Sequence, residues 1–372
     1  MRLSGFDEYP YHQHPMPFGT VATTDAHYND GYWFAFYAPG WYVNCGLRLH
    51  PNVNVMDGWA SVAHAERQIA VRASRALRPR YDELAVGPIK LELLEPMKRL
   101  RLSARENPAG IEFDIVMEAL SPPFVENRYQ HLKYGAVVND MIRYTQICRA
   151  EGRARIEGRD IAIDGWHAMR DHSWGVRSSM AMPTGINGTD RTADEADDRA
   201  LRLWVPFRVA DHSGFINTHE NAEGTALDFE GRLDYDDGRA VKILAARHAL
   251  DYLPGTKRPT GGTLELDGED GVTRKYTLAS AGTPADVQAC GYYRGWHDGQ
   301  SAGIWRGAEH LEHDAYDAKP GDDPTGPPHV AAKRRLGPTE FPMIMTGPGG
   351  AQGMAHFEHT LSGAYPRYGF GT

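Results

Sequence analysis

The chain has 372 residues, of which 41% are hydrophobic and 24% are charged, which is the composition of a folded globular protein and not of a disordered one. Its formal net charge of −9 leaves no basic surface for phosphates and argues against a nucleic-acid partner. Three widely separated cysteines form no disulfide framework, and no apolar run reaches the length of a membrane span. We therefore expect a cytoplasmic protein without a membrane-spanning segment.

The first clear element is an aromatic run at residues 32–37, followed by a second at 41–43. Apolar side chains at consecutive positions indicate a strand that is buried on one side and covered, or lining a cavity, on the other. Trp33 belongs to this run and is a candidate for substrate binding. Residues 63–77 are rich in alanine, and this composition predicts the one helix that we expect.

Most of the remaining periodic segments alternate apolar and polar residues and end at glycine turns, so strands dominate the prediction. Residues 100–104 and 111–117 form a predicted hairpin. Further strands are predicted at residues 142–148, 154–158, 161–165, 201–207, 226–235, 263–266 and 274–278. Residues 183–198 and 318–338 are rich in glycine, proline, threonine and charged residues, and they are predicted loops.

The most informative motif is Arg170-Asp171-His172-Ser173-Trp174-Gly175-Val176, followed by Arg177, which comes after a turn predicted at Gly165. If the motif is a strand, Asp171 and Ser173 face one side while His172 and Trp174 face the other. A titratable imidazole beside an indole suits proton chemistry on an apolar or aromatic molecule. A buried His–Trp pair that packs the end of a barrel, with Asp171 and Arg177 as a surface ion pair, accounts for the same residues.

The run Asp171-His172-Ser173-Trp174-Gly175 resembles the Asp-His-Asn-Trp-Gly region of the carotenoid 1,2-hydratase (hydroxyneurosporene synthase) family of tandem lipocalin-like proteins. The resemblance implies two lipocalin-like domains and an apolar substrate held without a metal or an organic cofactor. It also implies a site that contains His172 and Trp174. In that family a Tyr-x-Asp pair follows the motif, whereas the corresponding segment here offers Asp211 or Glu220 as the acid.

Seventeen histidines raise the question of a metal site. Only His12 and His14 have the spacing that lets a strand present two ligands on one face, and the sequence contains no zinc-binding motif. We therefore expect no bound metal. His297, followed by Asp298, and His219, followed by Glu220, could act as acids or bases, or could be structural residues whose neighbours point away from them.

We predict an all-β protein of two lipocalin-like barrel or sandwich domains packed side by side, residues 1–165 and 166–372. The predicted function is a cofactor-independent enzyme, a hydratase, another lyase or an isomerase, that transfers a proton on a hydrophobic or aromatic small molecule. The alternatives are a carrier that binds such a molecule unchanged and a scaffold without a cavity. Exposed edge strands could support a homodimer.

The residues that this prediction places in the site fall into two classes. The predicted catalytic residues are His172, Asp171, Arg177, His219 and Tyr144, and the predicted substrate-binding residues are Trp174, Trp204, Tyr129, Trp33 and His297.

Overall fold

Two antiparallel β-sheets make up nearly all of the computed structural model, which describes residues 5–10, 12, 14–133, 136–177, 199–318 and 338–371. The all-β prediction is confirmed. The predicted loop 183–198 and nearly all of the predicted loop 318–338 lie outside the described residues. The helices of the described part are 3-10 turns: η1 (Gly5–Glu8), η4 (Val287–Cys290), η5 (Pro348–Gly350) and η6 (Pro366–Tyr368). A helix long and apolar enough to cross a membrane does not occur among the described residues.

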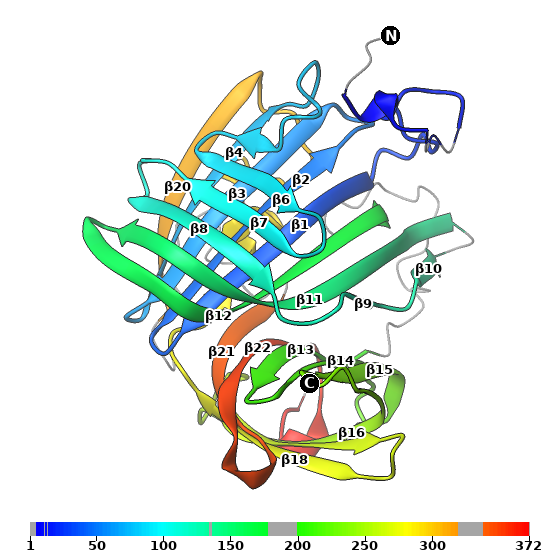
Figure 1. Cartoon of the computed structure of the whole chain (residues 1–372), viewed down its shortest axis with the longest axis vertical. Coiled ribbons are helices and arrows are strands. Elements are labelled where there is room, and N and C mark those ends of the chain that lie inside the picture. The colour runs from blue at the N-terminus through cyan, green and yellow to red at the C-terminus, as the bar shows by residue number, and fades with distance from the viewer. Residues whose placement is uncertain are drawn as a thin grey trace.

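The first sheet is a curled half-barrel with the strand order β20-β4-β3-β2-β1-β12-β11-β8-β7-β6-β5, to which β9 and β10 add by pairing with β11 (Figure 1). Its strands are β1 (Tyr28–Ala38), β2 (Trp41–His50), β3 (Val55–His64), β4 (Arg67–Ala76), β5 (Ala85–Val86), β6 (Ile89–Glu95), β7 (Arg99–Ala104), β8 (Ile111–Ala119), β9 (Phe124–Val125), β10 (Tyr129–Lys133), β11 (Ala136–Ile156), β12 (Arg159–Arg177) and β20 (Glu309–Asp317). The hairpin predicted over residues 100–117 is confirmed as β7 and β8.

The second sheet is a closed barrel of eight strands, because β13 pairs with β22 and β18 pairs with β21. Its strands are β13 (Leu201–Val209), β14 (His212–Glu220), β15 (Ala226–Tyr235), β16 (Ala240–Tyr252), β17 (Pro259–Gly268), β18 (Thr273–Ser280), β21 (Thr339–Thr346) and β22 (Gln352–Leu361), and the short β19 (Ala285–Asp286) adds to β21. In Figure 1 the barrel lies below the first sheet.

The helix predicted at residues 63–77 is wrong, because this segment holds the end of β3, a tight turn and β4. Ala65 and Glu66 both have positive φ angles, 48° and 61°, which is the backbone of a two-residue hairpin turn. Both faces of β4 are covered: Val71 packs in the core of the first sheet, and Ala70 packs against Tyr316 on the other side. A strand buried on both faces does not show the alternation of apolar and polar residues that marks a half-exposed strand. The prediction of a helix therefore rested on alanine content alone.

The turn predicted at Gly165 is a β-bulge inside one long strand. In the β11–β12 pair, Ala150 lies opposite Trp166 and Gly152 lies opposite Ile163, so two residues of β12 face one residue of β11. Gly165 has a φ of +61°, a conformation in which a side chain would be strained. The motif therefore continues a strand that began at Arg159 and does not start a new one.

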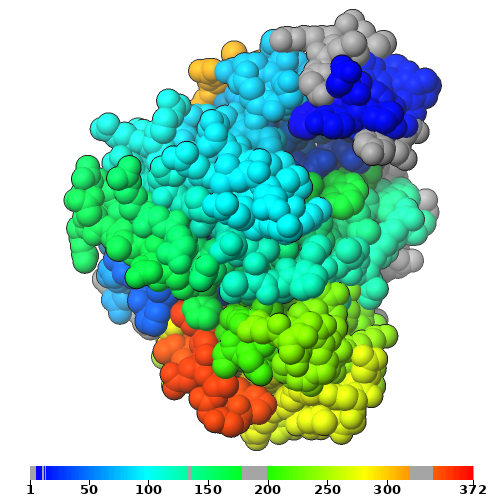
Figure 2. Space-filling model, in the orientation of Figure 1, coloured from blue at the N-terminus to red at the C-terminus, as the bar shows by residue number. Residues whose placement is uncertain are grey.

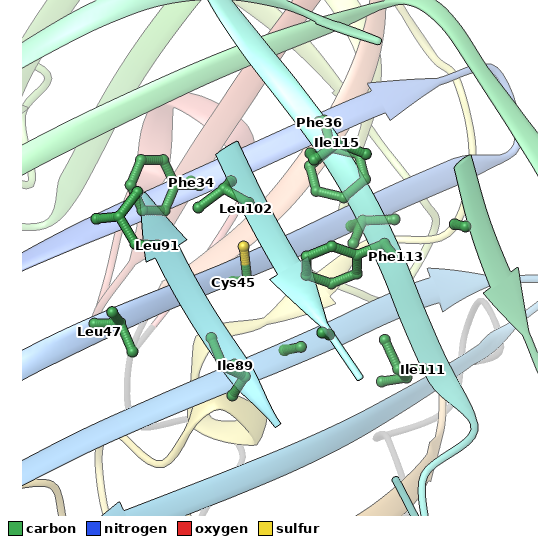
Figure 3. Packing of buried hydrophobic residues seen from close by; sticks show 14 of the residues in the cluster. Phe34, Phe36, Cys45, Leu47, Ile89, Leu91, Leu102, Ile111, Phe113 and Ile115 are labelled. Atoms are coloured by element: carbon green, nitrogen blue, oxygen red, sulfur yellow. The ribbon is translucent and has the colours of Figure 1, made fainter. Parts of the chain in front are cut away.

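Each sheet has its own hydrophobic core. In the first sheet, β6, β7 and β8 cross over β1 and β2, and the rings of Phe34, Phe36 and Phe113 pack between the two layers with Cys45 and Leu102 (Figure 3). The core of the barrel is formed by inward-facing side chains of all its strands, among them Phe207, Leu264 and Phe357. Alternation along each strand sends one set of residues into these cores and leaves the other set outside.

A third buried cluster joins the two sheets. The outer face of β1, with Trp33 and Tyr37, packs against Trp204 and Phe215 of the barrel and against Tyr292, which follows η4. The space-filling view shows the barrel and the first sheet in contact along a continuous boundary (Figure 2).

The two sheets do not divide the chain where we placed the division between domains. Residue 165 lies inside β12, so the chain passes from the first sheet to the barrel only after Arg177. The chain then returns, because β20 pairs with β4 at the edge of the first sheet before β21 and β22 complete the barrel. The motif thus belongs to the first sheet.

Candidate active site

Strand β12 presents its two faces to two different surroundings. The rings of His172 and Trp174 lie 5.1 Å apart on one face, between β1 and β11. Asp171 and Ser173 lie on the opposite face, where they are 8% and 1% exposed. The predicted alternation of the motif is confirmed, and it divides the predicted site residues into two groups.

The first group contains a hydrogen-bonded pair of His172 and Asp30. Nε2 of His172 lies 2.7 Å from Oδ1 of Asp30, which is on the neighbouring strand β1. The two side chains are 19% and 42% exposed, so the pair is within reach of a small molecule. A carboxylate that accepts the hydrogen bond of one ring nitrogen fixes the tautomer and stabilises the imidazolium, and the other nitrogen is then the one that can accept a proton.

Three aromatic rings surround His172. Tyr32 stacks on it with ring centroids 4.2 Å apart, and Tyr144 meets it edge-on at 5.5 Å. Trp174 lies on the side of the solvent and is 37% exposed. Burial, with a smaller effect of Asp30, raises the pKa of Tyr32, and burial raises the pKa of Tyr144. Both phenols are therefore neutral at physiological pH, and they could donate a hydrogen bond but not accept a proton.

Sequence reasoning missed Asp30 and Tyr32, which precede the motif by more than a hundred residues. A signal existed, since Tyr28-Asn29-Asp30 is a Tyr-x-Asp arrangement, but it precedes the motif, whereas the resemblance places this pair after the motif. The two acids proposed there have other partners, because Asp211 pairs with His212, and Glu220 pairs with His248 inside the barrel.

The opposite face of β12 carries the second group, in which Asp171 lies beside two arginines. Asp171 Oδ2 is 3.8 Å from Nη1 of Arg143 on β11. Arg143 is held by Glu126, to which its Nε and Nη2 donate hydrogen bonds of 2.7 and 2.5 Å. Burial raises the pKa of Asp171, although Arg143 and Arg48 oppose this effect. Arg177, at the end of β12, is on the same face.

Two of the predicted tryptophans lie in this second group as well. Trp33 is directly opposite Asp171 in the β1–β12 pair, and its Nε1 is buried without a hydrogen-bond acceptor among the described residues. Trp204 on β13 donates a hydrogen bond of 3.2 Å to Glu126, and the guanidinium of Arg143 lies over its ring at 5.1 Å. The structure thus brings together Asp171, Arg177, Trp33 and Trp204, on the other side of β12 from His172.

A buried polar trio extends this second group towards β21 and β22. Tyr42 donates a hydrogen bond to Oε2 of Glu340, and its hydroxyl is 2.8 Å from Nδ1 of His356. Burial raises the pKa of Glu340 to about 8 and lowers the pKa of His356 to about 3. Both side chains are therefore uncharged at neutral pH, as expected for groups removed from water without a full charge partner.

Two other predicted site residues form a network at the rim of the barrel. Nδ1 of His219 lies 2.8 Å from Oδ1 of Asp228 on the next strand. Arg199 is 3.9 Å from Asp228 and donates a hydrogen bond to the hydroxyl of Tyr129. His219 and Tyr129 therefore share a network with each other, whereas among the described residues the hydrogen-bond partner of His172 is Asp30.

Two clusters among the described residues have ligand atoms close enough together to hold a metal ion. In the first, His297 lies beside Glu312 and Asp314 on β20, and both acids are bound to the buried Arg72. His297 thus belongs to the edge of the first sheet, apart from both groups around β12. The second cluster is Glu340, His356 and Glu358, in which Glu358 is paired with Arg202. Arginine already occupies both clusters, so a cation would have to displace it.

A family model described as "Family of unknown function (DUF8625)" matches residues 3–328. None of the curated proteins matches the sequence. Among solved structures, a Nitrosomonas europaea protein described as a candidate AttH is 12% identical, with 95% of this chain and 98% of that chain covered at a TM-score of 0.51. Kievitone hydratase from Nectria haematococca is 9% identical, with 90% and 89% covered at a TM-score of 0.44. CghA with Sch210972 is 10% identical, with 90% and 89% covered at 0.49. The first of these likenesses shows that the fold is shared.

Proposed function

The chain belongs to the DUF8625 family of unknown function, and we propose that it is an enzyme that transfers protons on an apolar or aromatic small molecule at the His172–Asp30 pair. The reaction class that fits is a hydro-lyase or an isomerase. The proposal requires neither a metal nor an organic cofactor, because an imidazole held by a carboxylate can take up a proton and return it.

One observation carries the proposal, namely the arrangement of Asp30, His172 and the rings around them. Asp30 accepts the hydrogen bond from Nε2, so Nδ1 of His172 is the nitrogen with a lone pair. Tyr32, Tyr144 and Trp174 surround the imidazole with apolar area that suits a flat, unsaturated ligand. A base with a fixed tautomer beside an aromatic wall is an arrangement for proton abstraction.

The proposed chemistry balances without another reactant. Nδ1 of His172 takes a proton from a carbon atom of the substrate, and Asp30 stabilises the imidazolium that forms. The imidazolium then gives this proton to a hydroxyl group on the adjacent carbon, which leaves as water while a C=C bond forms. The reverse sequence is hydration, and return of the proton to another carbon is isomerisation. The likeness of Asp171-His172-Ser173-Trp174-Gly175 to the hydratase motif supports the hydro-lyase form.

The first experiment is native mass spectrometry of the protein purified from its own host, followed by denaturing extraction of any bound small molecule. The identified compound then serves as the substrate for turnover assays. We expect His172→Ala to lower turnover by about 10²- to 10⁴-fold, and Asp30→Asn to lower it as well. His12→Ala is the matched control, since His12 forms a His–Asp pair with Asp7 on the surface.

Full turnover by His172→Ala would show that the proposed role is wrong. A ligand that binds to wild type and to His172→Gln equally well and is never transformed would identify the protein as a carrier. The aromatic wall around His172 would serve such a carrier too, whereas a carrier does not need the pair of titratable groups.

A further inference from the structure

We propose that the buried face of β12 opposite His172 binds the carboxylate of an apolar organic acid, with Arg48 and Arg177 as the groups that hold the anion. This site is on the other side of β12 from the His172–Asp30 pair, so it does not depend on the function proposed above. Its residues come from β1, β2, β11 and β12 of the first sheet and from the segment around Tyr292, which packs against that sheet.

Arg48 is a buried cation whose partners are all neutral. It is 3% exposed, and it donates hydrogen bonds to Oδ1 of Asn29 at 2.6 Å, to Oγ of Ser173 at 3.4 Å and to the hydroxyl of Tyr292 at 3.3 Å. Among the described residues no carboxylate forms an ion pair with it. These bonds hold the guanidinium in place without neutralising its charge, and burial of an uncompensated charge is costly.

Arg177 lies near Arg48 and has even fewer partners. Within the described part of the chain its side chain makes no hydrogen bond and no ion pair. Burial lowers the pKa of its guanidinium, and the charges of Arg48 and Arg143 lower it further. Asp171 is close enough for its charge to act on both Arg48 and Arg177, but among the described residues it forms an ion pair with neither of them. A bound anion would supply the direct negative partner that both guanidinium groups lack there.

Arg143 in the same cluster shows how this protein satisfies a guanidinium by itself. Glu126 accepts two hydrogen bonds from Arg143 in a bidentate pair, and it accepts further bonds from Thr145 and Trp204. A carboxylate has the geometry that a guanidinium fork recognises, so a ligand carboxylate could pair with Arg177 as Glu126 pairs with Arg143.

The remaining unpaired atoms of this face indicate the rest of the ligand. Nε1 of Trp33 is a buried donor, and Oδ1 of Asp171 is a buried acceptor, and neither has a hydrogen-bond partner among the described residues. The rings of Trp59 and Tyr292 lie 5.1 and 5.9 Å from the ring of Trp33. A ligand with an apolar or aromatic body beside its carboxylate would contact these rings, and a hydroxyl group on it could donate to Asp171.

A glycine on β1 lets the side chain of Arg48 lie close to the backbone of the first sheet on this face. Gly31 of β1 lies between Arg48 of β2 and Ser173 of β12 in the sheet register. A Cβ atom at Gly31 would come within 2.5 Å of the carbonyl oxygen of Leu47. The absence of a side chain there lets Arg48 reach across β1 to Ser173, so it is a condition for the arginine position.

The test compares sodium benzoate with benzamide, its neutral analogue, and with inorganic phosphate, at an ionic strength kept constant with sodium chloride. Binding is measured by calorimetry and by the shift in melting temperature. We expect benzoate to bind and to stabilise the protein, and benzamide to have no effect. Arg177→Gln should weaken benzoate binding by about tenfold or more, and Arg177→Lys should weaken it less. Arg155→Gln, at an exposed pair with Asp160, should leave it unchanged.

Without a ligand, Arg177→Gln should melt at the wild-type temperature or above, because it removes an uncompensated charge. Failure of ligand-free Arg177→Gln to fold, or a clearly lower melting temperature, would show that Arg177 is structural and would overturn the proposal. The same holds if wild type does not respond to benzoate, if benzamide acts equally, or if both Arg177 variants bind benzoate like wild type. Stronger binding of phosphate than of benzoate would show that the site takes an inorganic anion instead.

Discussion

Tyr32 and His172 lie directly opposite each other in the β1–β12 pair, and their rings stack with centroids 4.2 Å apart. The contact joins the first residue of the aromatic run 32–37 to the motif. It also places Asp30, two residues earlier on the same face of β1, beside the imidazole. Cross-strand pairs of this kind fix the orientation of both side chains. The orientation of His172 therefore depends on β1 as much as on its own strand.

The ring of Tyr32 should contribute to stability through this stacking. We expect Tyr32→Leu to lower the free energy of unfolding by about 1 kcal/mol, the value of an aromatic pair beyond its buried area. Tyr32→Phe keeps the ring and should be close to wild type. Urea denaturation of the three proteins measures the difference, and equal losses in both variants would mean that the hydroxyl, not the stacking, matters.

Gly31 should not tolerate a side chain. A Cβ atom there would lie 2.5 Å from the carbonyl oxygen of Leu47 and 2.9 Å from Cα of Arg48, both backbone atoms that cannot turn aside. We expect Gly31→Ala to destabilise the protein by about 1–3 kcal/mol. Gly40→Ala is the control, because that position has open space and a φ of +83°, so only backbone strain of about 1 kcal/mol applies. Denaturant titration would disprove the prediction if Gly31→Ala were the milder change.

The buried pair of Glu126 and Arg143 should be important to the fold. Burial favours the neutral acid, but Arg143 and Thr145 outweigh it and hold the pKa of Glu126 below its ordinary value. Glu126→Gln removes the carboxylate that binds Arg143 in a bidentate pair and leaves only Asp171, 3.8 Å away, as a negative charge beside it, and we expect a loss of about 3–5 kcal/mol in unfolding free energy. Asp160→Asn at the exposed pair with Arg155 is the control and should have little effect. Chemical denaturation of wild type and both variants measures the unfolding free energies. Similar losses in Glu126→Gln and Asp160→Asn would contradict the prediction.

Glu340 should make stability depend on pH in the neutral range. Its pKa is about 8 in the folded protein against an ordinary value of 4.5, so the folded state binds one more proton than the unfolded chain between these values. Stability from this group is complete below about pH 4.5 and is lost as the pH rises through 8, with a slope of at most about 1.4 kcal/mol per pH unit.

Glu340→Gln keeps the shape of the side chain and removes this titration. We expect wild type to lose stability relative to the variant as the pH rises from 6 to 9, and the two curves to run parallel above that range. Thermal or urea unfolding at several pH values gives the difference in stability between wild type and the variant. The contributions of titrating groups that both proteins share cancel in this difference. A constant difference across the whole range would contradict the raised pKa of Glu340.

The alternation of residues predicted most of the strands and the opposite faces of the motif. It could not show that Gly165 is a bulge instead of a turn, because both require the same positive φ. It failed at residues 63–77, where β4 is covered on both sides and its polar residues, such as Gln68, Arg72 and Ser74, are buried with the apolar ones, so they do not mark an exposed face. The division at residue 165 misplaced the end of the first sheet because β12 is longer than any single predicted segment.

The sequence by itself determined that strands dominate the chain, and that His172 and Asp171 point to opposite sides once residues 170–177 form a strand, because both properties follow from a period of two along the backbone. Only the tertiary structure decided that Asp30 meets His172, that Arg48 contacts Tyr292, and that Trp204 contacts Glu126. These contacts join segments that are far apart in the chain. They form because both sheets bury their apolar faces together, and a local sequence pattern carries no information on which distant segments meet.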